Sequence, residues 1–72
     1  MPGRKASEDS RRLQILRAAY DVGARRGLAG LTVRHVAAKA DLSTGLVLFH
    51  FKAKEQLLIA LLDFVLETTT VL

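Results

Sequence analysis

The chain has 72 residues, half of them apolar, and carries 11 Lys and Arg against seven Asp and Glu. A chain of this length forms at most one small domain and buries only roughly 60% of its unfolded surface. The absence of cysteine excludes disulfide bonds, thiolate zinc sites and a cysteine nucleophile.

The first predicted helix runs from about Glu8 to Arg26. Its apolar positions recur at three- and four-residue spacing, which is typical of an amphipathic helix. Ser7 is expected to cap its start, and Gly27 is expected to end it. Residues 1–7 are then expected to form a flexible basic arm. The apolar positions are Leu13, Ile15, Leu16, Ala19 and Val22.

Two short helices are predicted next, over residues 33–40 and 44–50, with Thr32 and Ser43 as their N-caps. The turn between them has the pattern of a helix-turn-helix motif. It has a small residue at the expected helix crossing, Ala37. It also has a residue in the turn that tolerates positive φ, Asp41, and an apolar residue expected to point back into the core, Leu42. An ordinary helical hairpin without a role in DNA binding remains an alternative interpretation of this pattern.

A fourth helix is predicted from about Lys54 and is apolar nearly all round. Such a helix is normally buried on more than one side. Its apolar run is too short for a membrane span, which needs about 20 residues. We therefore expect its second partner surface in a following domain. The stripe expected to pack on the first helix is Leu57, Leu58, Leu61, Leu62 and Val65, whereas Ile59, Phe64 and Leu66 lie off it.

Charge is divided unevenly along the chain. From Met1 to Lys54 there are all 11 cationic residues and four acidic ones, a balance of +7, whereas residues 55–72 carry three acidic residues and no cation. Basic surfaces attract phosphate backbones or anionic lipid. From charge alone, a solvated basic face that binds nothing remains an alternative interpretation.

Residues 12–62 resemble the DNA-binding region of the TetR family of bacterial transcriptional regulators. The matching stretches, in the family's order and spacing, are Ile15 to Ala19, Arg26-Gly27, Leu31 to Ala37, Ser43 to Leu46, His50-Phe51 and Lys54 to Leu58. The resemblance implies an all-α fold. A three-helix, homeodomain-like helix-turn-helix domain would occupy residues 8–52. Residues 53–72 would begin a long fourth helix leading to a ligand-binding and dimerisation domain absent from this chain.

The resemblance also implies a function. Family members act as homodimers on palindromic operators in double-stranded DNA, and a small molecule bound in the larger domain usually releases them. The chain is therefore expected to belong to a cytoplasmic transcriptional regulator, most simply a repressor. No cofactor, metal or membrane contact is expected.

Site residues carried over by position lie on three predicted helices. Thr32 would cap the second helix and touch a phosphate, and Arg34 would reach a base edge or a phosphate. Lys54 would clamp a phosphate at the start of the fourth helix. His50 has two open roles, phosphate contact and packing. The recognition helix would open at the major groove with Ser43, Thr44, Gly45 and Leu46 and line its exposed side with Leu48, Phe49 and His50.

Four departures from the family pattern stand out. Ala53 replaces the usual Ser cap before the fourth helix, and the loss of such a cap costs about 1 kcal/mol. Leu48 replaces a usual Tyr and cannot bond a phosphate through a hydroxyl. Asp41 replaces the usual turn Gly and places a negative charge near the DNA side. Gly23 stands where a bulky apolar residue is usual, and we expect Tyr20 and Val22 to fill that space. The recognition surface is left largely apolar.

A different class of function is the alternative. The apolar fourth helix could dock a partner or lipid in a helical protein-interaction or membrane-surface module without DNA binding. An enzyme finds no support, because His35 and His50 lack metal-ligand spacing and the chain has no cysteine. Glu55 and Asp63 are two turns apart on the predicted fourth helix, and we interpret them as solvated charges and not as a catalytic pair.

Overall fold

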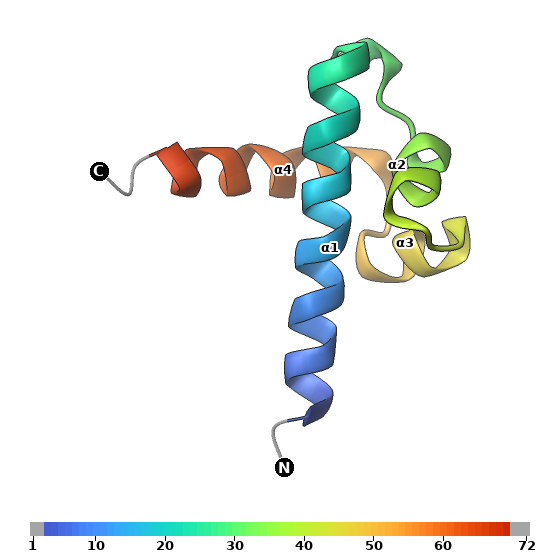
Figure 1. Cartoon of the computed structure of the whole chain (residues 1–72), viewed down its shortest axis with the longest axis vertical. Coiled ribbons are helices and arrows are strands. Elements are labelled where there is room, and N and C mark those ends of the chain that lie inside the picture. Colours follow the sequence, from blue (N-terminus) through green and yellow to red (C-terminus); the bar gives the residue numbers. More distant parts are fainter. Residues whose placement is uncertain (1–2, 70–72) are drawn as a thin grey trace.

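The computed structural model describes residues 3–69, with the side chains of residues 7–69. Within that range all the regular secondary structure is helical, which confirms the predicted all-α class (Figure 1). The helices are α1 (Gly3–Arg26), α2 (Val33–Ala40), α3 (Thr44–His50) and α4 (Lys54–Thr69), with a 3-10 turn, η1 (Leu28–Gly30), between α1 and α2.

The start of α1 differs from the sequence prediction. The helix begins at Gly3, so Ser7 lies inside it and does not cap it. The flexible arm expected over residues 1–7 is therefore helical at residues 3–7, and residues 1–2 lie outside the described part of the chain. The physical reason is local, because Arg, Lys and Ala are strong helix formers and fill residues 4–6.

The predicted helix boundaries at α2 and α3 are confirmed. Thr32 and Ser43 have extended backbone and act as N-caps. Their side-chain oxygens accept hydrogen bonds from the backbone N–H groups of His35 and Leu46, each at 3.1 Å. Gly27 follows α1 at φ 76°, a left-handed value that favours glycine, and so ends the helix as expected.

The turn between α2 and α3 is built on Asp41. Its φ of 62° and ψ of 43° lie in the left-handed region, as predicted. The Asp41 N–H donates to the Ala38 carbonyl at 3.2 Å, and the Leu42 N–H donates to the Ala37 carbonyl at 2.9 Å. This pair of bonds is a Schellman motif, which satisfies the last carbonyls of α2 and fixes the direction in which the chain leaves it.

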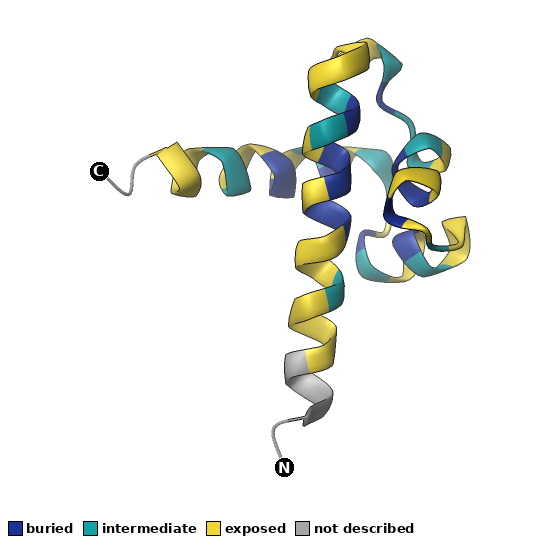
Figure 2. Cartoon of the chain, viewed as in Figure 1, coloured by how far each residue is buried: buried dark blue, intermediate teal, exposed yellow. Residues whose placement is uncertain are grey.

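One apolar core joins all the elements. Figure 2 shows buried residues where α1 and α4 cross and on the sides of α2 and α3 that face α1. No polar or charged side chain is buried in the described part of the chain. The largest fully buried side chains come from every helix and from the connector, and they are Ile15, Leu31, Val36, Val47 and Leu57.

Gly23 of α1 lies against the connector rather than against a neighbouring aromatic residue. A Cβ atom at this position would lie 3.4 Å from Leu31 Cδ1 and 3.9 Å from Leu28 Cδ2. The leucines therefore occupy the space beside the glycine. Val22 is buried, but Tyr20 is 54% exposed, so the expectation that Tyr20 fills this space is wrong.

α4 crosses α1 and then projects away from the α2–α3 pair (Figure 1). Leu57 and Leu61 are buried and Val65 packs against the core, as predicted. The predicted stripe is wrong at two positions, because Leu62 is 58% exposed and Phe64 packs on the core instead. Residues 57, 61, 64 and 65 share one helix face, whereas residue 62 is rotated away from it.

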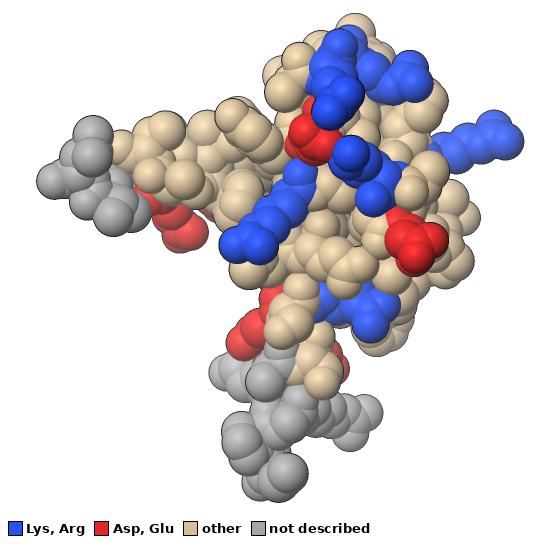
Figure 3. All heavy atoms as spheres, in the orientation of Figure 1, with Lys and Arg blue, Asp and Glu red and all other residues tan. Residues whose placement is uncertain are grey.

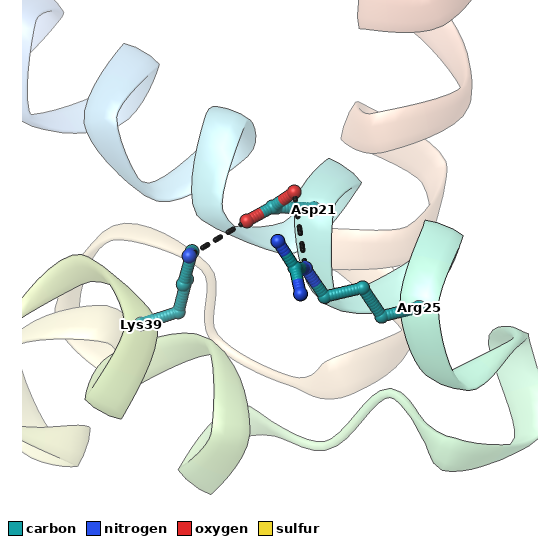
Figure 4. Close-up of polar contacts among 3 residues, drawn as sticks. All are labelled: Asp21, Arg25 and Lys39. Atoms are coloured by element: carbon teal, nitrogen blue, oxygen red, sulfur yellow. Dashed lines mark ion pairs between the residues drawn. The ribbon is translucent and has the colours of Figure 1, made fainter.

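Polar contacts tie α2 to α1. Gln14 Nε2 donates to the Ala40 carbonyl at 2.7 Å. Asp21 lies between two cations, with its carboxylate 2.8 Å from Lys39 Nζ and 3.6 Å from Arg25 Nε (Figure 4). The hydrogen bond from Lys39, reinforced by the charges of Lys39 and Arg25, lowers the pKa of Asp21 below its ordinary value of 3.8.

A pH-dependent stability follows from this ion pair. A lowered carboxyl pKa stabilises the folded state above the ordinary pKa of 3.8, and that contribution is lost as pH falls through the lowered value. We expect Asp21→Asn to lower the thermal midpoint slightly at neutral pH and to equal the wild type in strong acid. Thermal melts of both proteins across this pH range provide the check, and a difference that does not change with pH would contradict it.

Candidate nucleic-acid interface

α3 is held to the core by one fully buried residue. Val47 is 0% exposed, and it is the only buried residue of α3. The residues pointing the other way are Thr44, Gly45, Leu48 and Phe49, all exposed. Their i, i+1, i+4, i+5 spacing places them on one face. We call these four residues the outward face of α3.

The start of α3 presents backbone rather than bulky side chains. The Ser43 hydroxyl accepts the Leu46 N–H but retains a proton that it can donate. At Gly45 an added Cβ atom would meet only the Ser43 Oγ atom, at 3.9 Å. Nothing within the fold therefore requires glycine at position 45. A glycine without an internal reason is typical of close backbone approach to a ligand.

The start of α2 carries two predicted site residues. The Thr32 hydroxyl accepts the His35 N–H at 3.1 Å and lies 2.8 Å from His35 Nδ1. A phosphate would therefore compete with His35 for that hydroxyl. Arg34 is exposed in the first turn of α2 and takes no part in the ion pairs seen among residues 7–69, which centre on Asp21. Its guanidinium keeps its donors available.

The end of α3 lies beside the N-terminal part of α1. Residues of the two helices line one shallow groove, and they are Ser7, Glu8, Arg11, Leu46, Phe49 and His50. The sequence prediction missed Arg11 as a neighbour of the site. In the sequence Arg11 is marked only by its positive charge. The periodicity of apolar residues does not reveal which end of α1 meets α3, so it could not assign Arg11 to the site.

His50 and Lys54 complete the set of predicted residues. The His50 ring is half-buried and meets the Phe49 ring edge-on, with centroids 5.3 Å apart and planes at 90°. The His50 ring therefore packs against an exposed neighbour on α3, and both of its expected roles stay predictions. Lys54 is half-buried at the first position of α4. Thr32 and Arg34 thus lie at the start of α2 and Lys54 at the start of α4, the helices that precede and follow α3 in the chain.

Basic side chains gather over α1 and α2 on the face that Figure 3 shows, with acidic groups between them. The projecting part of α4 shows only acidic charge there. Within residues 3–69 no helix is long and apolar enough to cross a membrane. The described residues also contain no group of three or more His, Asp or Glu side chains that could hold a metal ion.

Comparison with known proteins identifies the family. Residues 15–61 match the model of the bacterial regulatory proteins of the tetR family. The chain is 47% identical over 49 residues to an HTH-type transcriptional repressor of Mycobacterium tuberculosis and, equally, to an HTH-type transcriptional regulator of Mycobacterium bovis. Each match covers 68% of this chain but only 26% of the relative's length. No solved structure matches the chain significantly. Because the family model spans most of the chain, including the whole helix-turn-helix, the chain belongs to the TetR family.

Proposed function

We propose that this chain is the DNA-binding segment of a transcriptional regulator and binds duplex DNA in a sequence-specific manner. The supporting observation is α3, a short helix anchored by Val47 that exposes a whole face and has, as its second residue, a glycine that the fold does not need. Thr32 and Arg34 at the start of α2 and Lys54 at the start of α4 would supply contacts on either side. Regulators of this kind bind DNA without catalysis, so no enzymatic role is assigned.

The wider biology is inferred from the relatives. One relative is named a transcriptional repressor, and we propose repression for this protein as well. We further propose that it acts in the cytoplasm as a homodimer on a palindromic operator and that a small molecule releases it. The matched segment is only 26% of each relative. We therefore expect dimerisation and ligand binding to depend on residues outside it.

One observation favours a second candidate function. Ile59 and Leu62 of α4 are 61% and 58% exposed. Apolar side chains that project from a helix in this way are typical of a protein-interaction or membrane-surface module. The two functions differ in ligand, because the first requires duplex DNA and the second requires an apolar partner or lipid.

A binding experiment separates the two candidates. Preferred sites are first selected from a random duplex library with the 72-residue chain, and affinity is then measured by fluorescence anisotropy at several salt concentrations. If the chain binds DNA, the selected duplexes are expected to share a common sequence. The logarithm of the affinity should then fall linearly with the logarithm of the salt concentration, with a slope of about −0.9 for each phosphate contact. Binding to anionic vesicles without duplex affinity would support the second function instead.

Lys54→Ala tests the phosphate contact at the start of α4. We expect weaker binding to all duplexes alike and a salt slope that is flatter by about 0.9, because one phosphate contact is lost. Arg17→Ala is the matched control, since it removes one exposed cation from α1 on the side that faces the end of α4. A sequence-dependent loss in Lys54→Ala, or an equal loss in Arg17→Ala, would show that the assigned role is wrong.

A further inference from the structure

The outward face of α3 is unusual in its chemistry for a surface that meets DNA. Among its four residues only Thr44 has a side chain that can form a hydrogen bond. Leu48 is 41% exposed and Phe49 is 66% exposed. The half of this face nearer the C-terminus of α3 is therefore an apolar projection.

Contacts of the Phe49 ring and the place of Leu48 beside the core favour one direction for this projection. The Phe49 ring is held edge-on to His50, with centroids 5.3 Å apart, and it lines the groove formed with Arg11 of α1. Leu48 is one residue from the fully buried Val47, so its backbone position is set by the core. An apolar group in a fixed position can discriminate between surfaces that differ by a single methyl group.

In the major groove of B-DNA the apolar group on a base edge is the C5-methyl group of thymine. Cytosine has hydrogen at the same ring position, whereas 5-methylcytosine carries the same methyl group there. Resting on the proposed function, we propose that Leu48 and Phe49 make this chain a reader of 5-methylpyrimidines. Its half-site would present thymine methyl groups to α3, and cytosine methylation at those positions would also strengthen binding.

Two pairs of duplexes test this inference, each pair differing only in methyl groups. In the selected site, thymine is replaced by uracil at one position at a time. At the same positions, a C·G pair is compared with a 5-methyl-C·G pair. Affinity is measured by fluorescence anisotropy. In both comparisons we expect the duplex that lacks a contacted methyl group to bind about fourfold more weakly. This is the factor that burial of one methyl group gives.

Protein variants assign the effect to the two side chains. In Phe49→Ala and in Leu48→Ala, we expect the ratio of the affinities for the thymine and uracil duplexes to fall close to one. The dependence of affinity on salt concentration should not change, since neither side chain contacts phosphate. Both residues are exposed, so the fold is expected to tolerate the changes. Leu28→Ala is the control, because Leu28 is 59% exposed but lies on η1. Its ratio should match the wild type.

Equal affinity for thymine and uracil duplexes, with sequence-specific binding retained, would overturn this inference and leave the proposed function standing. A methyl effect that persists in both α3 variants would overturn the assignment to Leu48 and Phe49. Absence of any duplex binding would overturn the inference and the proposed function together.

Discussion

Leu57→Ala is expected to unfold a large fraction of the chain. Leu57 is 0% exposed and joins α4 to the core that α1, α2 and α3 share. Replacing a fully buried leucine by alanine costs about 2–5 kcal/mol. A domain of this size rarely has more than about 3–5 kcal/mol of stability in total. Urea or thermal unfolding followed by circular dichroism provides the measurement.

Leu62→Ala is the matched control on the same helix. Leu62 is 58% exposed, and its truncation is expected to change the free energy of unfolding by no more than about 0.5 kcal/mol. Equal effects of the two substitutions would mean that α4 does not pack on α1 through the face described above.

Gly45→Ala is expected to stabilise the protein and yet weaken its binding to DNA. Glycine costs roughly 0.5–1 kcal/mol relative to alanine inside a helix. The added methyl group would meet only the Ser43 Oγ atom at 3.9 Å, so the free protein gains stability without a clash. In the complex the same methyl group would hold α3 away from the duplex. We expect a loss of about tenfold in affinity, which corresponds to 1.4 kcal/mol.

Gly23→Ala controls for the gain in helix propensity. Gly23 lies inside α1, where a Cβ atom would make ordinary contact with Leu31 at 3.4 Å. We expect a similar or smaller gain in stability and an unchanged affinity for DNA. If both alanine variants bind DNA as the wild type does, the close approach of α3 at Gly45 is refuted.

Local signals predicted the helix-turn-helix because its boundaries are set by neighbouring residues. A threonine or serine that accepts a hydrogen bond from the N–H three residues later fixes a helix start. Thr32 and Ser43 both do so. Asp41 was likewise recognisable, since few residues tolerate the left-handed backbone that this turn requires.

Features that depend on tertiary packing were predicted less well. The choice between Leu62 and Phe64 on α4 depends on the angle at which α4 crosses α1, and apolar periodicity does not contain that angle. The neighbour of Gly23 is Leu31, a connector residue whose path follows from the 3-10 turn. The start of α1 at Gly3 could not be read from a cap, because Ser7 is equally compatible with a helix interior.

The candidate site, like the fold, could be predicted from the sequence only in part. The resemblance to the family predicted which residues belong to α3 and placed Leu48, Phe49 and His50 on its exposed side. Leu48 and Phe49 are exposed as expected, whereas His50 is half-buried. Arg11 joins the surroundings of the site through the packing of α1 beside α3, a contact between residues far apart in the chain.

Backbone amide chemical shifts of the labelled chain, recorded during titration with the selected duplex, show which face of the protein meets DNA. We expect the largest changes at residues 32–35, 43–50 and 54–55, with little change along the exposed side of α4. Changes concentrated at residues 59–69, with the start of α2 and the whole of α3 unaffected, would contradict the assignment of this face to DNA.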